Sequence, residues 1–503
     1  MLTVRIIQLS VNSNIAYNSS FMLLLIVRII HLYTTSNIAH NANFVYTCFM
    51  AMVFKRKFYE KLLDWKKNSN GSRAILVEGA RRIGKSTLCE LFAQNEYKSY
   101  ILIDFALVTK KIKDMFFDYL NDLDTFFMLL QADFGVTLYK RESVIIFDEV
   151  QKFPRAREAI KYLIADGRYD YIETGSLISI KENVKDIVIP SEERHLKMYP
   201  LDFEEFCWAL GKEQLCNYIK QCFIKREPLE RNLHNDALLV FKQYMLVGGM
   251  PQSLAAFLES EKSFEEADKQ KRDILNLYRD DIMKIKARYR SKVLSLFDQI
   301  PSLLSRHEKR VVFNEIDKGK TAEQYEETFF WLSNAMISNE CFLCNDPNVG
   351  LSLNETRAYI KCYFCDTGLL VSHAFDENEL MQEEIYKQIL GDKLGLNEGM
   401  FYENMIAQML TANGHKLFFY THYNDEKHRN DIETDFLLSN NSKLKFKVFP
   451  IEVKSGRNYT TTSLERFSEK FKERIDCEYI IHPRNLIEKN GVLCIPPYMA
   501  MCL

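Results

Sequence analysis

The residues with the clearest chemical signature form the stretch GARRIGKST, which runs from Gly79 to Thr87. An apolar run at residues 74–78 precedes it and the helix-forming sequence LCELFAQN follows it, so the stretch should connect a buried strand to a helix. In such a turn, successive backbone N–H groups and the start of the helix face a phosphate group. The sequence therefore predicts a nucleotide-binding loop made of Gly79, Ala80, Arg81, Arg82, Ile83, Gly84, Lys85, Ser86 and Thr87.

Three side chains of this loop have separate predicted roles. Lys85 would reach the β- and γ-phosphates of ATP, the Ser86 hydroxyl would coordinate Mg²⁺, and Thr87 would lie near the α-phosphate. ATP and Mg²⁺ are therefore the predicted cofactors. A glycine-rich turn that contains Lys-Ser by chance is the alternative, and the order of strand, loop and helix argues against it.

A second element supports the nucleotide site. Residues 143–150 read SVIIFDEV, an apolar strand that ends in the carboxylates Asp148 and Glu149. Asp148 can hold the Mg²⁺ shell, and Glu149 can act as the general base that polarises the attacking water. Acidic residues also end many strands without any catalytic role, but the phosphate-binding loop upstream makes that alternative weaker here.

The carboxyl-terminal part contains a second group of charged residues. Glu403 lies on the amphipathic stretch MFYENMIAQMLTANG, Asp435 opens the strand-like run TDFLL, and residues 450–454 read PIEVK. On that strand Glu452 and Lys454 share one face. Asp435 followed by Glu-x-Lys is the signature of restriction-endonuclease-like folds, in which carboxylates bind Mg²⁺ and the lysine orients or activates water. Glu403 would complete the metal shell.

The same residues also allow a reading without cleavage. Charged residues alternate on many strands, and a nuclease-like fold can persist as a binding module, because a fold does not imply a function. The sequence leaves open whether this second site cleaves anything, and on which substrate.

Four cysteines resemble a zinc site by spacing alone. The pairs Cys341/Cys344 and Cys362/Cys365 are separated by 17 residues. Both pairs lie in strand-like runs, where residues three apart point to opposite faces, and no glycine directly follows either pair. Buried core cysteines are therefore the favoured interpretation, with zinc as the alternative.

Composition limits the class of protein. The chain has 503 residues, of which 47% are hydrophobic and 27% charged, and this predicts a soluble multidomain protein. The net charge of −2 excludes a globally basic nucleic-acid binder, so any polynucleotide site must be a local patch. Twelve cysteines without a secretory signal favour free thiols in a reducing compartment, and we expect a cytoplasmic location.

The first 51 residues differ from the rest. No Lys, Asp or Glu precedes Lys55, and VRIIQLSVNSNIAYNSSF from Val4 recurs as VRIIHLYTTSNIAHNANF from Val27. The apolar run at residues 21–30 is interrupted by Arg28 and is shorter than the roughly 20 residues of a membrane-spanning helix. The segment is interpreted as a non-native leader with a start assigned too far upstream, the alternatives being a targeting peptide and a membrane anchor.

Five stretches together resemble a known family. GARRIGKST, FDEVQKFP, ETGSLIS, ERHLKMYPLDFEEF and YMLVGGMPQSL occur here in the order found in prokaryotic AAA ATPases that carry a C-terminal domain of unknown function. The resemblance runs from about Phe54 to the end of the chain. It implies an α/β fold with an AAA-type P-loop NTPase core, a helical lid, a small winged-helix unit and a C-terminal domain, here expected to be restriction-endonuclease-like.

The expected divisions follow from these features. They are a leader at 1–51, the ATPase core at 52–228, the helical lid at 229–288, the winged-helix-like unit at 289–346 and the nuclease-like domain at 347–503. The charged helix from Lys269 is read as a solvated face and not as a nucleic-acid surface. Acidic residues near 323–327 favour a structural or protein-contact role for the winged-helix unit.

The resemblance also suggests a γ-phosphate sensor. AAA-type ATPases place it at the end of the strand that here reads YDYIETGS, so Thr174 and Ser176 are the candidates. The alternative is an ordinary Thr-Gly-Ser turn. Where the family has a Gly-Arg pair, this chain has Ser-Glu-Glu-Arg, so Arg194 is either a surface arginine, which is favoured, or a residue that completes a neighbour's site.

Two functions from different classes remain. In the leading hypothesis, the ATPase cycle controls a C-terminal nuclease-like domain that acts on DNA or RNA. In the alternative, the chain is a nucleotide-dependent switch or scaffold for protein partners, with a catalytically silent module. A homo-oligomer is compatible with both, and no membrane partner is expected.

Overall fold

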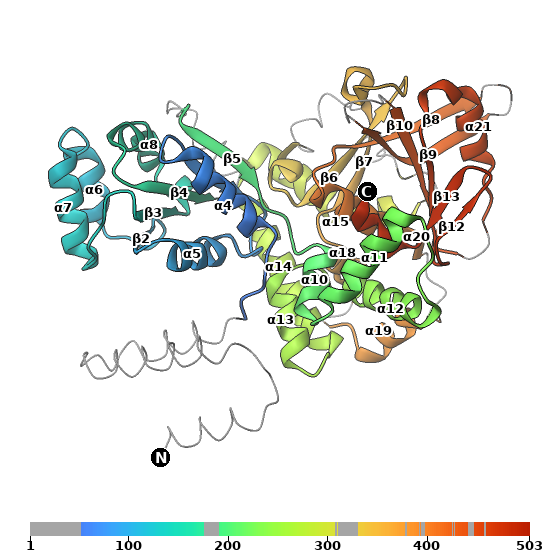
Figure 1. Cartoon of the computed structure of the whole chain (residues 1–503), viewed down its shortest axis with the longest axis horizontal. Coiled ribbons are helices and arrows are strands. Elements are labelled where there is room, and N and C mark those ends of the chain that lie inside the picture. The colour runs from blue at the N-terminus through green and yellow to red at the C-terminus, as the bar shows by residue number, and fades with distance from the viewer. Residues whose placement is uncertain are drawn as a thin grey trace, which may run out of the picture. The chain divides into compact units, whose positions relative to one another are not determined.

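The computed structural model describes residues 52–175, 191–306, 309, 330–377, 380–391, 393, 398–424, 426, 428–440, 447–456 and 459–503 (Figure 1). The predicted leader (1–51), the sensor candidate Ser176, and residues 307–308 and 310–329 of the predicted winged-helix unit lie outside these residues. Residues Val53–Leu503 form one compact unit. Among the described helices, none combines the length and the apolarity needed to cross a bilayer.

A five-stranded parallel sheet forms the amino-terminal part of this unit. Its strand order is β2-β3-β4-β1-β5, so the carboxyl ends of β3, β4 and β1 lie side by side. The strands are β1 (Ala74–Glu78), β2 (Ser99–Asp104), β3 (Ser143–Asp148), β4 (Asp170–Gly175) and β5 (Glu193–Lys197). β1, β3 and β4 are buried along their whole length; β1 and β3 are mostly apolar in sequence, whereas β4 reads DYIETG and buries polar side chains.

Helices cover this sheet on both faces, and alternate strand residues feed two apolar cores. Ile75 and Val77 of β1 share a core with Leu88 and Phe92 of α5, whereas Leu76 joins the second core. The second core also takes buried side chains from α6, α7 and α8. The helices are α4 (Phe58–Ser69), α5 (Lys85–Glu96), α6 (Lys110–Asp118), α7 (Leu123–Phe134) and α8 (Pro154–Asp166), with the 3₁₀ turn η1 (Val150–Lys152) after β3.

Helices follow the parallel sheet for about a hundred residues. Where the sequence predicts a helical lid, the structure has α12, α13 and α14. Pro251 stands at the first position of α13, where a missing N–H costs nothing. The helices of this region are α10 (Phe203–Ala209), α11 (Glu213–Lys225), α12 (Arg231–Val247), α13 (Pro251–Glu259), α14 (Phe264–Met283) and α15 (Ala287–Ser305).

The carboxyl-terminal part is built on an eight-stranded mixed sheet in the order β12-β13-β11-β10-β9-β8-β6-β7. The central pair β9/β10 is antiparallel, and β10/β11 is parallel. The strands are β6 (Ser338–Cys344), β7 (Glu355–Phe364), β8 (Leu417–Asn424), β9 (Arg429–Asn440), β10 (Lys447–Val453), β11 (Glu478–Ile481), β12 (Ile487–Lys489) and β13 (Val492–Ile495).

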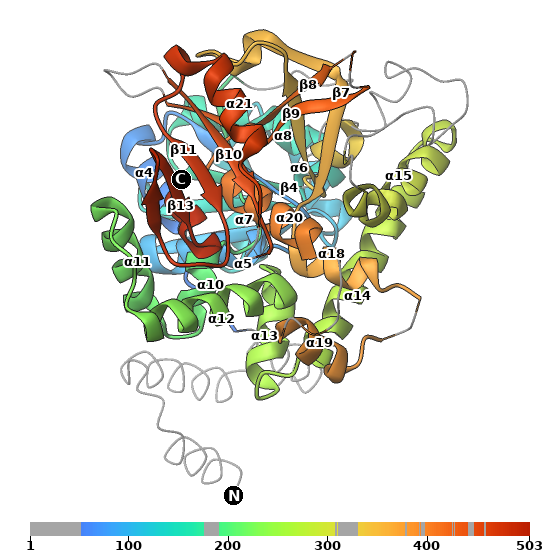
Figure 2. The same ribbon diagram turned by 90° about the vertical axis from the view of Figure 1, so that its right-hand side faces the viewer.

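One almost fully buried helix, α20 (Glu398–Ala412), packs against this sheet and against α18 (Figure 2). At its end, the Asn413 side-chain amide donates to the carbonyls of Met501 and Leu503, which fixes the chain terminus against the helix. The remaining elements are α18 (Thr367–Ala374), α19 (Glu383–Leu390), α21 (Thr462–Lys470), η2 (Leu351–Asn354), η3 (Lys472–Arg474) and η4 (Pro497–Cys502).

The predicted winged-helix unit is not supported as a separate unit by its described residues. Its predicted last strand is β6, which pairs with β7 and β8 and so belongs to the large C-terminal sheet. The predicted boundary after residue 346 therefore falls inside that sheet. A strand at 341–344 was correctly expected, but a short strand does not reveal which sheet it joins.

The four cysteines with zinc-like spacing lie on or next to β6 and β7. All four are buried and free. Within the described parts of the chain, no three or more His, Cys, Asp or Glu side chains converge as a metal site. The structure thus agrees with their interpretation as core residues.

Candidate functional site

The predicted phosphate-binding loop lies between β1 and α5, in the expected order of strand, loop and helix. Gly84 precedes the helix with φ of 88°, a left-handed conformation that glycine adopts without steric cost. Arg82 and Thr87 are exposed, and Ile83 is buried. The sequence prediction of this local geometry is confirmed.

Lys85 is the buried cation of this loop. Its ammonium donates to the carbonyl oxygens of Gly79 and Ala80 at 3.1 and 2.9 Å. Burial lowers the pKa of Lys85 to about 8, and the nearby carboxylates Glu149 and Asp148 only partly oppose this shift. A phosphate would give the ammonium a charged acceptor in place of neutral carbonyls, which is the stronger type of hydrogen bond. The loop is therefore suited to an anion.

Asp148 joins three elements at the carboxyl edge of the sheet. It ends β3, and its Oδ1 accepts hydrogen bonds from Ser86 Oγ of α5 at 2.7 Å and from Thr174 Oγ1 of β4. A hydroxyl and a carboxylate are oxygen ligands of the kind that Mg²⁺ prefers, so Ser86 and Asp148 fit the predicted ion. Of the two sensor candidates, Thr174 reaches this cluster, whereas Ser176 lies outside the described residues.

Glu149, the predicted general base, directly follows β3. Its backbone is left-handed, with φ of 53°, and its carboxylate accepts a hydrogen bond from Gln151 Nε2 at 2.5 Å. Sequence reasoning missed Gln151, although it lies only two residues further in the same motif. Arg194 is exposed on β5, and this chain alone gives it no place in the site.

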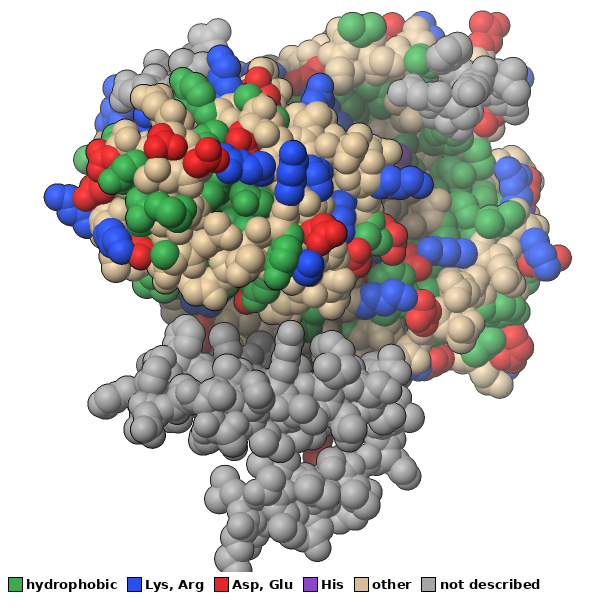
Figure 3. Space-filling view, turned by 60° about the vertical axis from the view of Figure 1, so that its left-hand side comes forward, with side chains coloured by type: hydrophobic (Ala, Val, Ile, Leu, Met, Phe, Trp, Pro, Cys, Tyr) green, Lys and Arg blue, Asp and Glu red, His purple; other side chains and the backbone are tan. Residues whose placement is uncertain are grey.

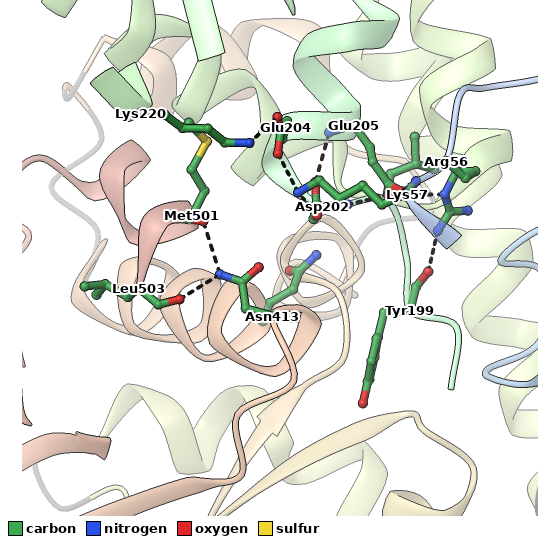
Figure 4. A network of polar contacts seen from close by, with 12 residues as sticks. Arg56, Lys57, Tyr199, Asp202, Glu204, Glu205, Lys220, Asn413, Met501 and Leu503 are labelled. Carbon is green, nitrogen blue, oxygen red and sulfur yellow. Dashed lines mark hydrogen bonds and ion pairs between the residues drawn. The ribbon is translucent and has the colours of Figure 1, made fainter. Parts of the chain in front are cut away.

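Two arginines secure the loop from outside. Arg56, just before α4, donates to the Ile83 carbonyl at 3.0 Å. It also donates to the Tyr199 carbonyl at 2.6 Å and pairs with Glu205 at 3.1 Å (Figure 4). Arg81 pairs with Asp281 of α14 at 2.9 Å. Sequence analysis did not identify Arg56, because a lysine- and arginine-rich segment before a helix gives no signal of burial.

The second predicted site assembles on β9 and β10. The backbone N–H of Val453 donates to Asp435 Oδ2 at 2.7 Å, and Lys454 pairs with Glu452 at 2.8 Å. The antiparallel register, in which Phe436 opposes Ile451, places Asp435 next to the Glu-x-Lys segment. The expected proximity of Asp435, Glu452 and Lys454 is therefore present.

Glu403 of α20 has a different environment from the expected one. Its carboxylate contacts the Lys309 ammonium and accepts a hydrogen bond from the Tyr363 hydroxyl at 2.5 Å. Lys361 Nζ is 3.5 Å from Glu403 Oε1. Burial alone would raise the pKa of Glu403, but Lys309 and Lys361 outweigh it and hold that pKa below its ordinary value. Glu403 is thus bound to protein cations, and its predicted role as a metal ligand stays a prediction.

Glu452 and Asp435, by contrast, lack sufficient positive charge. Burial raises the pKa of Glu452 to about 7, and burial together with the Glu403 charge raises that of Asp435. Both Glu452 carboxylate oxygens are buried; the Lys454 ammonium lies 2.8 Å from Oε2, and Oε1 has no hydrogen-bond partner among the described residues. A buried carboxylate oxygen without such a partner fits a divalent cation, so Asp435 and Glu452 could hold the predicted Mg²⁺.

Three family models match the chain. Residues 71–207 match an AAA domain. Residues 239–379 and 398–498 match two domains of unknown function, DUF8612 and DUF4143. The first match covers the parallel sheet with its phosphate loop and Asp148. This part of the chain is therefore a nucleotide-binding P-loop ATPase domain of the AAA type.

Two solved structures illustrate the similarity of this chain to known proteins. The Walker-type ATPase PABY2304 of Pyrococcus abyssi is 15% identical, with 64% of this chain and 96% of that chain covered and a TM-score of 0.38. RuvB, the Holliday junction branch migration motor of Thermotoga maritima, is 12% identical, with 61% and 92% covered and a TM-score of 0.26. Among curated proteins none matches.

Proposed function

We propose that this protein hydrolyses ATP and that its nucleotide cycle controls the carboxylate site of the C-terminal domain, which acts on nucleic acid. The observation that carries the proposal is a continuous set of contacts from the phosphate loop to Glu403. It passes through the turn at Gly248 to Pro251 and through Asp366, and it uses short, mostly buried contacts.

The first contact lies at the phosphate loop itself. A β-carbon placed on Gly84 would lie 3.6 Å from Pro251 Cγ, so the turn before α13 packs directly on the loop. Gly249, two residues before Pro251 in the same turn, donates its backbone N–H to Asp366 Oδ2 at 2.5 Å. Movement of the phosphate loop would therefore be transmitted to Asp366, because protein interiors are close-packed.

The glycines of this turn are required by a close approach of three backbone segments. A β-carbon on Gly249 would lie 2.1 Å from the Leu201 carbonyl oxygen, and one on Gly368 would lie 2.5 Å from the Gly248 nitrogen. Leu201 follows β5 of the ATPase sheet, and Gly368 lies in α18. The turn thus contacts both the nucleotide domain and the C-terminal part without intervening side chains.

The last contact reaches α20. Gln408 accepts from the Thr367 backbone N–H at 2.8 Å and donates to the Tyr244 hydroxyl at 2.9 Å, while Asn404 accepts from the Phe364 N–H at 2.7 Å. Glu403 is the neighbour of Asn404 on the same helix. A shift of α18 would therefore move the helix that positions Glu403.

At the carboxylate site, Asp435 and Glu452 would hold Mg²⁺, which supplies an activated water and charge stabilisation for phosphodiester chemistry when bound. Lys454, paired with Glu452, would orient that water. Glu403 would position the surrounding lysines. A nucleotide-dependent change in α20 would then alter the charge around the metal ligands.

The decisive experiment measures two activities of the same full chain. We expect Mg²⁺-dependent cleavage of DNA or RNA whose rate differs between ATP and ADP, and whose loss in Lys454→Ala leaves ATP hydrolysis intact. Lys489→Ala, an exposed lysine on β12, is the matched control and should retain both activities. If the wild type cleaves no DNA or RNA while it hydrolyses ATP, the nuclease part of the proposal is wrong.

One observation favours the second candidate function, a nucleotide-dependent switch for protein partners. The carboxylate site already contains three lysines, Lys309, Lys361 and Lys454, which is compatible with a silent module. On the face shown in Figure 3, basic, acidic and apolar side chains are interspersed. Binding of a protein partner that depends on ATP, together with absent cleavage, would support this function instead.

A further inference from the structure

A buried ammonium group lies among the carboxylates of the C-terminal site. Lys361 of β7 is 1% exposed, and its Nζ is 3.5 Å from Glu403 Oε1, 3.6 Å from Glu433 Oε1 and 3.9 Å from Asp435 Oδ1. All three distances exceed a normal hydrogen bond. The ammonium is therefore shared between three carboxylates on α20 and β9 and is not paired tightly with one of them.

The fold gives Lys361 no other place for its charge. On β7 it lies between buried neighbours, Ile360 and Cys362, and its ammonium is 5.0 Å from the centre of the Phe419 ring. A lysine at such a position is strongly unfavourable unless it is paired. Here the carboxylates of Glu403, Glu433 and Asp435 surround the ammonium and provide that pairing.

The charges around Lys361 limit how much additional positive charge the site can accept. The site has four carboxylates, Glu403, Glu433, Asp435 and Glu452, and three ammonium groups, Lys309, Lys361 and Lys454. With all seven groups ionised, as they would be around a bound metal ion, the formal charge is three minus four, or one negative charge. Two divalent ions would bring four positive charges to this buried site. One divalent ion needs far less compensation.

The negative charge that is not compensated lies on one side of the site. Glu403 is engaged by Lys309, Lys361 and Tyr363, whereas Glu452 pairs with Lys454 at Oε2 and its buried Oε1 has no hydrogen-bond partner among the described residues. A divalent ion would therefore bind at Glu452 and Asp435, and the space between Glu403 and Asp435 is already taken by an ammonium.

We propose that Lys361 is a resident cation of the carboxylate site, which takes the place of a second divalent ion and limits the site to one ion at Asp435 and Glu452. This inference rests on the proposed metal-dependent function of that site. Because Lys361 is buried, it is a positioning residue and does not touch a substrate. It fixes Glu403 and Glu433 and sets the number of ions.

The test counts Mn²⁺ ions bound to the full chain without nucleotide, by electron paramagnetic resonance of the free ion and by calorimetry. Asp435→Asn/Glu452→Gln provides the background from the ATP site. We expect about one ion for the wild type and about two for Lys361→Met, or at least tenfold tighter binding, because removal of a cation favours another. Lys361→Arg should keep one ion.

Lys416→Met is the matched control, because Lys416 is a half-exposed lysine before β8 that pairs with Glu355, away from the site. It should bind the same number of ions as the wild type. Circular dichroism and thermal melting report whether each variant is folded. If Lys361→Met does not fold, the wild-type count decides: one ion supports the inference and two ions overturn it.

The other outcomes separate the two levels of the proposal. One ion in both the wild type and a folded Lys361→Met, with unchanged affinity, overturns the role of Lys361 and leaves the metal-dependent function standing. Loss of the ion in folded Lys361→Met also overturns it. Binding of no ion by any variant above the background contradicts the metal-dependent function itself.

Discussion

The ATP site and the carboxylate site differ in the charge that the protein leaves uncompensated: a positive charge in the first and a negative charge in the second. In the first, Lys85 is a buried cation that contacts only neutral carbonyls, and burial lowers its pKa to about 8. In the second, Glu452 is a buried anion that pairs with Lys454 at Oε2 and has no hydrogen-bond partner at Oε1, and burial raises its pKa to about 7. Each shift indicates that the protein alone does not compensate the charge. The first site is suited to an anion and the second to a cation.

The sites also differ in how much the protein has already supplied. Lys85 donates its hydrogen bonds to neutral carbonyls, with the carboxylates Glu149 and Asp148 only nearby, whereas the carboxylate site contains the Lys361 ammonium directly among three carboxylates. A nucleotide therefore adds charge that the first site lacks, whereas a metal must share the second site with resident cations. We therefore expect the charge balance of the first site to depend strongly on bound nucleotide, and that of the second site to depend less on a bound metal ion.

The largest expected effect is the loss of ATP turnover when the residues of the ATP site are replaced. Lys85→Ala removes the cation that the phosphates require, and we expect ATP turnover to fall by about a thousandfold, with weak ATP binding. Glu149→Gln should retain ATP binding and lose turnover to a similar extent, because it removes the base and keeps the size of the side chain. Steady-state hydrolysis and fluorescent-nucleotide binding measure both changes.

Two controls make this test specific. Lys98→Ala removes an exposed lysine of the same domain, which pairs with Glu142 at 3.5 Å, and should change turnover less than twofold. Undiminished hydrolysis in Glu149→Gln would show that another group is the base. In both catalytic variants the ion count of the carboxylate site should stay at the wild-type value, since the count is made without nucleotide and neither substitution removes a residue of that site.

The second effect comes from a substitution in the turn that connects the ATP site with the carboxylate site. Gly249→Ala would place a methyl group 2.1 Å from the Leu201 carbonyl, which the backbone contacts of the turn cannot accommodate without a shift. We expect a loss of about 3 kcal/mol in the free energy of unfolding, as for an overpacked core, and weaker effects of ATP on the C-terminal activity. Urea denaturation measures the first quantity.

The matched substitution is Gly391→Ala, because its β-carbon would meet only the Lys387 carbonyl at 3.4 Å and flexible lysine atoms further away. It should cost less than about 1 kcal/mol. Equal stability losses in Gly249→Ala and Gly391→Ala would mean that the close approach at Gly249 does not matter, and the proposed coupling would lose its main support.

The sequence predicts the ATP site much better than the carboxylate site. The strand, the loop and the carboxylates at 148 and 149 lie within short continuous motifs, and parallel strands bring their carboxyl ends together. Asp435, Glu452 and Lys454 were also found, since two neighbouring antiparallel strands contain them. The lysines that surround Glu403 were missed, because Lys361 comes from β7 and Lys309 from a remote segment.

Contacts between segments remote in sequence also explain why the partners of β6 and of Arg56 could not be predicted. The apolar pattern of β6 identifies a strand but not its partners, so its membership in the C-terminal sheet could not be predicted. Arg56 contacts Ile83 and Tyr199 across long sequence separations. Local sequence carries no information about such contacts.

The third effect concerns Lys271 of α14, a buried lysine that can be compared with Lys361. It is fully buried like Lys361, but its ammonium contacts the Leu246 carbonyl at 2.7 Å and the Tyr386 hydroxyl at 2.9 Å, with the Asp268 carboxylate 3.9 Å away. Burial lowers the pKa of Lys271 to about 8, while the pKa of Lys361 is raised. The number of nearby carboxylates decides the direction.

The consequence for stability has a definite sign. Between pH 8 and 10 the unfolded chain, with a lysine pKa of 10.5, binds more protons at this position than the folded chain. Stability should therefore rise with pH in that window, by on the order of 2 kcal/mol from this group. Lys271→Met should lack this part of the slope. Thermal melting of both proteins from pH 7 to 10 measures the difference, and parallel curves would contradict the assignment.

The smallest expected effect tests whether Arg81 binds the nucleotide, as its place in the loop predicts. In the structure its side chain pairs with Asp281, and both side chains are roughly one third exposed, at 41% and 31%. Such pairs contribute less than about 1 kcal/mol, and Lys284 also contacts Asp281 at 2.7 Å. Arg81→Ala should therefore change stability by less than that and ATP affinity by less than about threefold.

A larger effect on ATP affinity would mean that the ATP site has a second cation, Arg81, beside Lys85. If Arg81→Ala weakens ATP binding tenfold or more without loss of stability, Arg81 leaves Asp281 and joins Lys85 at the phosphates when ATP binds. Asp281→Asn separates the two cases, because it frees Arg81 without removing it and should then strengthen ATP binding. Equal, small effects of both substitutions would confine Arg81 to its contact with α14, with Lys85 as the cation of the ATP site.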